Sequence, residues 1–311
     1  MKKFIFRRII TALITLWIII TLTFVLMHAI PGGPFSSKKK KLPPVVVEAL
    51  ENKYHLNDPL IKQYFDYIGG VLRFDFGPSY KFEGMTVNDM IKKGFPISAR
   101  FGILAFLMSF LIGIPLGIIS ALRAGHWEDR VITVFITLGM CIPGFILASV
   151  LMYIFAYKLG WLPIYGIDSW KSYIMPVIVM TIGEVTSIAR ILRSSILEVL
   201  DQDYVLMARS KGLPEYKVII KHVFRNALIP IVTMVGPMLT GILTGSFTAE
   251  KIFNIPGMGR FFIDGIGNRD YTLIMGITIF TTVLLLIGVT LSDILYGLVD
   301  PRITIDNLES E

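Results

Sequence analysis

Charged residues are scarce in this 311-residue sequence: they make up 17% of the chain, whereas a soluble globular chain carries roughly 25%. Hydrophobic residues make up 54% and gather into long runs. Cysteine is almost absent, because Cys141 is the only one, so the sequence excludes an intrachain disulfide and offers no zinc-like Cys/His cluster. The composition therefore predicts an integral membrane protein.

Motifs for chemistry are also missing. The sequence has no GxxxxGK[ST] phosphate loop, so we do not expect this chain to bind and hydrolyse ATP itself. It has no HExxH, no GxSxG and no pair of intramembrane carboxylates. The four histidines fall in four separate places and suggest no shared site. We accordingly expect neither catalysis nor a metal or other cofactor in this chain.

Long apolar stretches are what the sequence does contain. A helix needs about 20 apolar residues to cross the hydrocarbon core of a bilayer. The first stretch, Ile9 to Ile30, exceeds the h-region of a cleavable signal peptide, so we interpret it as a retained transmembrane helix. The sequence predicts an all-α polytopic membrane protein whose six transmembrane helices span residues 9–30, 101–122, 131–157, 173–192, 227–249 and 272–298.

Lysine and arginine predict the orientation of these helices. In the short loops, most of them fall on the side of the N-terminus, so the positive-inside rule places both termini in the cytoplasm. The long segment from 31 to 98 is then external. Its amphipathic runs "PPVVVEALENKYHL" and "DPLIKQYFDYIGGVL", with prolines suited to helix starts, favour a folded cap over a solvated spacer.

The predicted organisation follows from these assignments. Residues 1–30 are a cytoplasmic start and the first transmembrane helix, and residues 31–98 are the external cap. Residues 99–299 form a five-helix core with a cytoplasmic loop at 190–226, and residues 300–311 are a cytoplasmic tail.

Glu184, in "VMTIGEVTSIAR", is the main charged candidate inside a predicted span. An intramembrane carboxylate is a functional-site hypothesis by default, here as a polar wall of a transport path. The equally weighted alternative is a carboxylate that faces protein or cavity water and is hydrogen-bonded to Thr181 or Ser187.

The stretch "DYVLMARSKGLPEYKV" at 203–218 predicts a short helix between the fourth and fifth spans. Asp201 or Asp203 can cap its start, Gly212 can end it in the left-handed conformation, and Pro214 can begin the next helix at its first position. A helix of about eight residues is marginal in water, so residues 204–208 need a surface to bury against. That surface is either a groove of a partner protein, or the chain's own helices or the lipid headgroups.

Several motifs give the chain a family resemblance. The stretch "ARSKGLPEYKVIIKHVFRNALIP" resembles the cytoplasmic EAA loop of ABC importer permeases in the dipeptide/oligopeptide branch. The segments "PGGPF", "DFGPSY", "GSFTAEKIFNIPGMG", "NRDYTLIMG" and "DPRI" are similar to that branch in the same order, most of all to its B-type oligopeptide permease subunits.

The resemblance implies a type I importer permease fold in the bacterial cytoplasmic membrane. It also implies the partners: a second, similar permease subunit, two cytoplasmic ATPase subunits that bind ATP and Mg, and an external solute-binding protein that delivers oligopeptides. Dipeptides, nickel or another small solute remain open as cargo, and a stand-alone secondary transporter is the alternative from another class.

In that family the loop helix couples to an ATPase. By position, Ala208 matches the second alanine of the EAA pattern and Gly212 its glycine, whereas Leu206 and Met207 replace the glutamate and the first alanine. Arg209, Lys211 and Leu213 become contact candidates by proximity.

Overall fold

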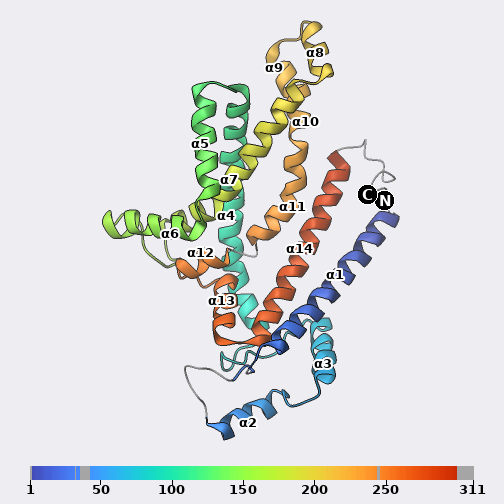
Figure 1. The fold of residues 1–311 in the computed structure, drawn as a ribbon, viewed down its shortest axis with the longest axis vertical. Coiled ribbons are helices and arrows are strands. Elements are labelled where there is room, and N and C mark those ends of the chain that lie inside the picture. The colour runs from blue at the N-terminus through green and yellow to red at the C-terminus, as the bar shows by residue number, and fades with distance from the viewer. Residues whose placement is uncertain (1, 32, 36–42, 244–245, 300–311) are drawn as a thin grey trace. The chain divides into compact units, whose positions relative to one another are not determined.

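The computed structural model describes residues 2–31, 33–35, 43–243 and 246–299, and these residues fold almost entirely as helices without a β-strand (Figure 1). The chain divides into two compact units. The first comprises residues 1–98 and 256–286, and the second comprises residues 99–255 and 287–311. The helices α4 (Val87–Leu122) and α14 (Tyr271–Val299) each contribute to both units.

The first unit holds α1 (Lys2–Ala29), α2 (Pro44–Lys53), α3 (Leu60–Leu72) and α13 (Met258–Asn268), with the beginnings of α4 and α14. The helices α2 and α3 confirm the two amphipathic runs predicted between residues 43 and 72. Their unit has an apolar core to which Ile20, Met90, Met258 and Leu273 contribute.

Asp270 fixes the start of α14 in this unit. Its carboxylate is fully buried and accepts hydrogen bonds from the backbone N–H of Leu273 at 3.3 Å and the hydroxyl of Thr272 at 3.0 Å, as an N-cap does. It also accepts from the hydroxyl of Ser79 and the N–H of Tyr80, so the loop that contains "DFGPSY" is tied to α14.

The second unit is arranged around α7 (Lys171–Leu200). Packed with it are the rest of α4, α5 (Trp127–Cys141), α6 (Gly144–Leu151), the π-helix η1 (Met152–Lys158) and α11 (Ile229–Leu243). The short elements are α8 (Asp203–Ser210), α9 (Glu215–Val218), the π-helix η2 (Ile219–Phe224), α10 (Arg225–Ala227) and α12 (Phe247–Ile252). Ile188, Leu192 and Ile196 of α7 are buried in its core.

Glycines permit close approach within this unit. A Cβ atom on Gly288 of α14 would overlap the Thr240 hydroxyl of α11, and one on Gly236 would overlap the Gly288 carbonyl. The side-chain hydroxyl of Ser292 donates a hydrogen bond to the Thr233 carbonyl at 2.8 Å across the same contact. Small residues therefore allow the backbones of α11 and α14 to touch.

The third predicted span, residues 131–157, is divided into two helices in the structure. Within residues 131–157 the chain breaks between α5 and α6, whose axes differ by 102°, so α6 leaves α5 at nearly a right angle (Figure 1). The cause is Pro143: the residue before a proline avoids the helical region, and Ile142 is extended at φ −85° and ψ 114°.

Five described helices are long and apolar enough to cross a membrane, or six if the bent pair counts as one span. The second begins at Val87 rather than near residue 101, because Thr86 and Asp89 form a capping box ahead of it. The Thr86 hydroxyl donates to the Asp89 carboxylate at 2.7 Å, and its oxygen accepts from the Asp89 N–H at 3.1 Å. The predicted tail, 300–311, lies outside the described residues, and the predicted domain limits and membrane orientation stay predictions.

Candidate functional site

The predicted short helix is present as α8, Asp203–Ser210. Its N-cap is Gln202 rather than Asp201 or Asp203: Asp201 ends α7, and Asp203 lies in the first turn of α8, where a carboxylate still suits the positive end of the helix. Gly212 ends the helix at φ +73°, as predicted, and its N–H bonds the Arg209 carbonyl at 2.9 Å. Pro214 is the N-cap of α9 rather than its first helical residue as predicted, because α9 begins at Glu215.

One face of α8 belongs to the core of its own unit. Val205 is fully buried and Ala208 is 5% exposed, in an apolar cluster with Val218, Val223 and Ile196. Ala208, which the family resemblance predicts to take part in ATPase coupling, packs in this core. The sequence left open whether a partner protein, or the chain's own helices or the lipid headgroups, would bury the apolar residues of this helix. The chain's own helices bury this face.

The other face of α8 is apolar and uncovered. Leu206 is 50% exposed and Met207 is 57% exposed, although both are large hydrophobic residues on an eight-residue helix. Lys211 is exposed just beyond the helix, and Leu213 after it is 38% exposed. The two residues that depart from the family pattern therefore lie on the face that is free to contact another molecule.

Arg209 is held by an ion pair across the glycine turn. Its guanidinium donates to both carboxylate oxygens of Glu215, with Nη2 at 2.6 Å from Oε1 and Nε at 3.2 Å from Oε2. This hydrogen bonding lowers the pKa of the Glu215 carboxyl and raises the pKa of Arg209. The pair links α8 to α9 and fixes the turn at Gly212 between them.

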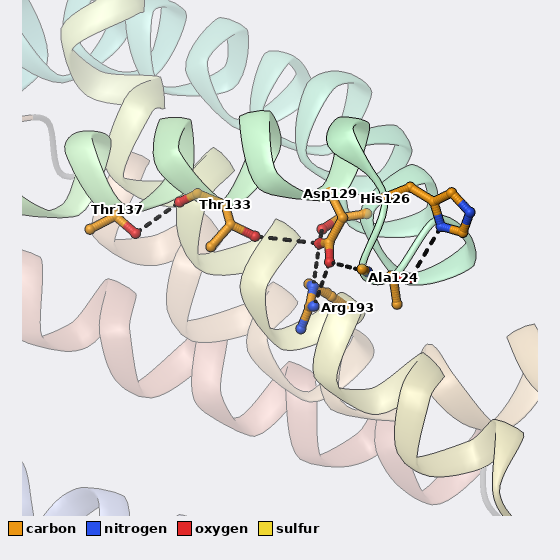
Figure 2. A network of polar contacts seen from close by, with 8 residues as sticks. Ala124, His126, Asp129, Thr133, Thr137 and Arg193 are labelled. Carbon is orange, nitrogen blue, oxygen red and sulfur yellow. Dashed lines mark hydrogen bonds and ion pairs between the residues drawn. The ribbon is translucent and has the colours of Figure 1, made fainter.

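A buried ion pair, which the sequence did not predict, joins three segments of the same unit. Asp129 in the first turn of α5 is 5% exposed, and Arg193 of α7 donates to its two oxygens at 2.8 and 2.9 Å. Figure 2 shows the guanidinium facing the carboxylate.

Further donors to the same carboxylate are the Ser120 hydroxyl of α4 at 2.5 Å and the N–H of Gly125 at 3.0 Å. From the sequence, Arg193 counted only toward the charge of its side of the membrane. The available signal was the acidic pair Glu128 and Asp129 at a helix start that follows a glycine turn. Its partner lies 64 residues away, and a single sequence does not indicate that pairing.

Glu184 lies in a groove of about 620 Å³ in the second unit, beside the break between α5 and α6. The groove is lined by Pro143 and Gly144 at the break, by α7 around Glu184, and by Gly241, Ile242 and Ser246. Glu184 is partly buried and makes no hydrogen bond or ion pair with another described residue, including Thr181 and Ser187. The predicted coupling residues around α8 belong to a different part of this unit.

Known protein families match most of the chain. Residues 113–305 match the family described as "Binding-protein-dependent transport system inner membrane component", and residues 1–98 match the description of its N-terminal region. The chain belongs to this family. The predicted resemblance to ABC importer permeases is confirmed.

Curated members of the permease family match nearly end to end. The "Oligopeptide transport system permease protein OppB" of Haemophilus influenzae is 43% identical over 305 residues, which cover 97% of this chain and 99% of the relative. The "Dipeptide transport system permease protein DppB" of Bacillus subtilis is 44% identical over 303 residues, which cover 97% and 98%. OppB of Salmonella typhimurium is 41% identical, with 97% and 99% covered.

Solved structures support the permease fold. The MetNI methionine ABC transporter in an inward-facing conformation aligns with a TM-score of 0.56 and 17% identity, covering 68% of this chain and 96% of that chain. An amino acid ABC transporter crystallised with histidines aligns equally well, with 67% and 94% covered. At this identity the likeness concerns the fold alone, and it confirms the predicted all-α importer permease fold.

Family membership makes this chain the multi-pass membrane component of a transport system that depends on a binding protein. It is a transport subunit rather than an enzyme. In the described part of the chain, no three His, Cys, Asp or Glu side chains come together as a metal site would require.

Proposed function

We propose that this chain is a transmembrane subunit of an ATP-driven importer of short peptides in the bacterial cytoplasmic membrane. The observation that carries this proposal is the near full-length similarity, above 40% identity, to permeases named for oligopeptide and dipeptide transport. Both names fit equally well by identity, so the substrate class we propose is the peptide itself, from dipeptides to oligopeptides.

The coupling of this subunit to ATP rests on α8. A short helix with one face held in the core by Val205 and Ala208 has a fixed orientation, and its other face presents Leu206 and Met207. Such a face suits a helix-in-groove contact, which we assign to a cytoplasmic ATPase subunit. Because α8 is anchored, a movement of that groove would shift α7 and α8 together rather than bend the loop.

The residues predicted for coupling then have separate roles. Ala208 and Gly212 position the helix and its turn, and Arg209 locks that turn through Glu215. Lys211 and Leu213 are exposed and can contact the ATPase directly. Leu206 and Met207, which depart from the family pattern, join them as the main contacts.

The remaining partners complete the transporter. A second permease subunit forms the other half of the path, two ATPase subunits bind ATP and Mg, and an external binding protein delivers peptide. This chain itself needs no cofactor. ATP binding closes the ATPases and opens the path outward, peptide enters beside Glu184, and hydrolysis resets the inward-facing state. Both termini, in this arrangement, lie in the cytoplasm.

Reconstitution into proteoliposomes with these partners tests the proposal. We expect peptide uptake that requires ATP, binding protein and all subunits, and no uptake by this chain alone. Uptake by this chain alone, or assembly without any ATPase, would contradict it.

A separate experiment tests the proposed docking face of α8, which Leu206 and Met207 form. The double change Leu206→Ser and Met207→Ser should release the ATPase subunits on size-exclusion chromatography. Leu72→Ser, at a leucine of α3 that is 76% exposed, repeats the leucine change alone at another exposed site and should not. Equal ATPase retention in both variants would remove the assignment of the docking face.

A further inference from the structure

The groove beside Glu184 is lined mainly by apolar residues and glycines and holds one formal charge. Among the described residues that line it, Glu184 is the only ionisable side chain with a formal charge, and no lysine or arginine lies on its walls. Ser187 and Ser246 line the groove as well, and the Ser246 hydroxyl oxygen also accepts the Ala249 N–H at 3.3 Å as the N-cap of α12. The groove therefore favours a cation.

The break in the helix adds a backbone acceptor. A proline has no N–H, so Pro143 cannot donate to the carbonyl of Gly139 four residues earlier, and that carbonyl loses its helical partner. Gly139 and Met140 line the groove at the end of α5, where the negative end of the helix dipole lies. Carbonyl oxygens at such broken helices are suited to hold cations within membranes.

A partly buried carboxylate without a partner is costly unless a cation pairs with it. We infer that Glu184 and the acceptors at the α5–α6 break bind the primary ammonium group of a peptide in transit. An ammonium has three donors and no acceptor, which matches a carboxylate, a free carbonyl and hydroxyl oxygens. A volume of about 620 Å³ accommodates the end of a peptide around that group.

This inference rests on the proposed function and assigns a chemical preference to the path. Every unmodified peptide carries an amino-terminal ammonium, so the site would act on cargo of any sequence. A lysine side chain carries the same group, and the two sources are separated by the choice of peptide.

The experiment measures kcat/KM for ATP-driven uptake by the full reconstituted transporter. Three peptides of equal length are compared: an alanine peptide with a free amino terminus, its N-acetylated form, and an N-acetylated form with one lysine. Each is tested with the parent chain and with Glu184→Gln. Because the same binding protein serves both, its own preference cancels in the ratio between parent and variant.

For the free alanine peptide we expect Glu184→Gln to lower kcat/KM about tenfold, equivalent to about 1.4 kcal/mol. The N-acetylated alanine peptide should change less than about twofold. The lysine peptide shows which ammonium group the site binds. If Glu184→Gln lowers its kcat/KM as much as that of the free alanine peptide, the site accepts either ammonium group. If its kcat/KM does not fall, the site binds only the amino terminus. Glu198→Gln, at an exposed glutamate of the same helix, removes the same charge away from the groove and should spare all three peptides.

Equal losses of kcat/KM for the free and acetylated alanine peptides would overturn the inference, because the carboxylate would then affect uptake without binding the ammonium group. So would a sodium requirement for both peptides that Glu184→Gln abolishes, since the site would then hold an alkali cation. If the parent transporter imports none of the three peptides, the proposed function fails instead, so the two failures are distinguishable.

Discussion

Breaking the Asp129–Arg193 ion pair should destabilise the second unit, because three segments converge on one buried carboxylate. Removing one partner of a buried ion pair costs about 3–5 kcal/mol in general. Here the Arg193 side chain is 31% exposed and water can partly solvate it, so we expect about 2–4 kcal/mol for Asp129→Asn. In the asparagine variant an amide donor would also face the donors of Arg193.

The assay is unfolding of the purified chain in mixed detergent micelles, followed by loss of helical circular dichroism. Arg193→Met and the double variant complete a double-mutant cycle. The double variant should be less destabilised than the sum of the two single variants, because it leaves neither charge buried alone. Asp168→Asn, at an exposed aspartate of the same unit, should change stability by less than about 0.5 kcal/mol.

Two results would refute this reasoning. Additive losses in the double variant would mean that the two side chains do not interact energetically. A loss below about 0.5 kcal/mol for Asp129→Asn would mean that the carboxylate is solvated rather than buried.

Three further predictions concern the turn after α8 and the helix contact in the same unit. Gly212→Ala should cost about 1–2 kcal/mol through its left-handed backbone alone, since a Cβ there meets no neighbouring atom. Peptide uptake should fall with Gly212→Ala and more with Gly212→Trp, but not with Gly160→Ala, which carries the same strain at φ +63° elsewhere; equal uptake in all three would contradict the role of the turn. Because Arg209 lowers the pKa of Glu215, the ion pair is complete above the ordinary glutamate pKa of about 4.3 and is lost only as the pH falls through the lowered pKa of Glu215. Hydrogen exchange at Gly212 and Leu213, corrected for the intrinsic rate, should accelerate below about pH 4 in the parent and be fast at all pH values in Glu215→Gln; a pH-independent parent would disagree. Gly288→Ala should cost about 1–3 kcal/mol by forcing α11 and α14 apart, whereas Gly241→Ala, whose Cβ has open space, should cost under about 0.5 kcal/mol, and similar unfolding midpoints for both would disprove the close contact.

The sequence predicted those features that depend on local chemistry. The C-terminal end of α8 follows from Gly212, and the apolar runs predicted the long helices, whereas the N-cap of α8 is Gln202 and not one of the predicted aspartates. The break at Ile142 was also encoded locally, by Pro143, but hydrophobicity runs unchanged through it, so the apolar pattern alone predicted one span. Which face of α8 is buried depends on Val218 and Ile196, which pack against it only in the folded chain.

Contacts between residues far apart in the chain could not be predicted from the sequence. Arg193 and Asp129 are both unremarkable as charges near helix ends, and only the packing of α5 against α7 pairs them. The groove at Glu184 likewise needs the bend between α5 and α6, which brings Pro143 and Ser246 to the same opening. The residue was predictable from its position in a span, but its surroundings were not.

The two faces of α8 can be altered independently during evolution. Val205 and Ala208 pack in the chain's own core, so a substitution at either residue alters the stability of this subunit whatever its partner is. Leu206 and Met207, the residues between them, have no such constraint within the chain. With Leu206 and Met207 as the proposed ATPase contact, a lineage could exchange one ATPase for another by substituting these two residues to fit a new groove, and the subunit would keep its fold.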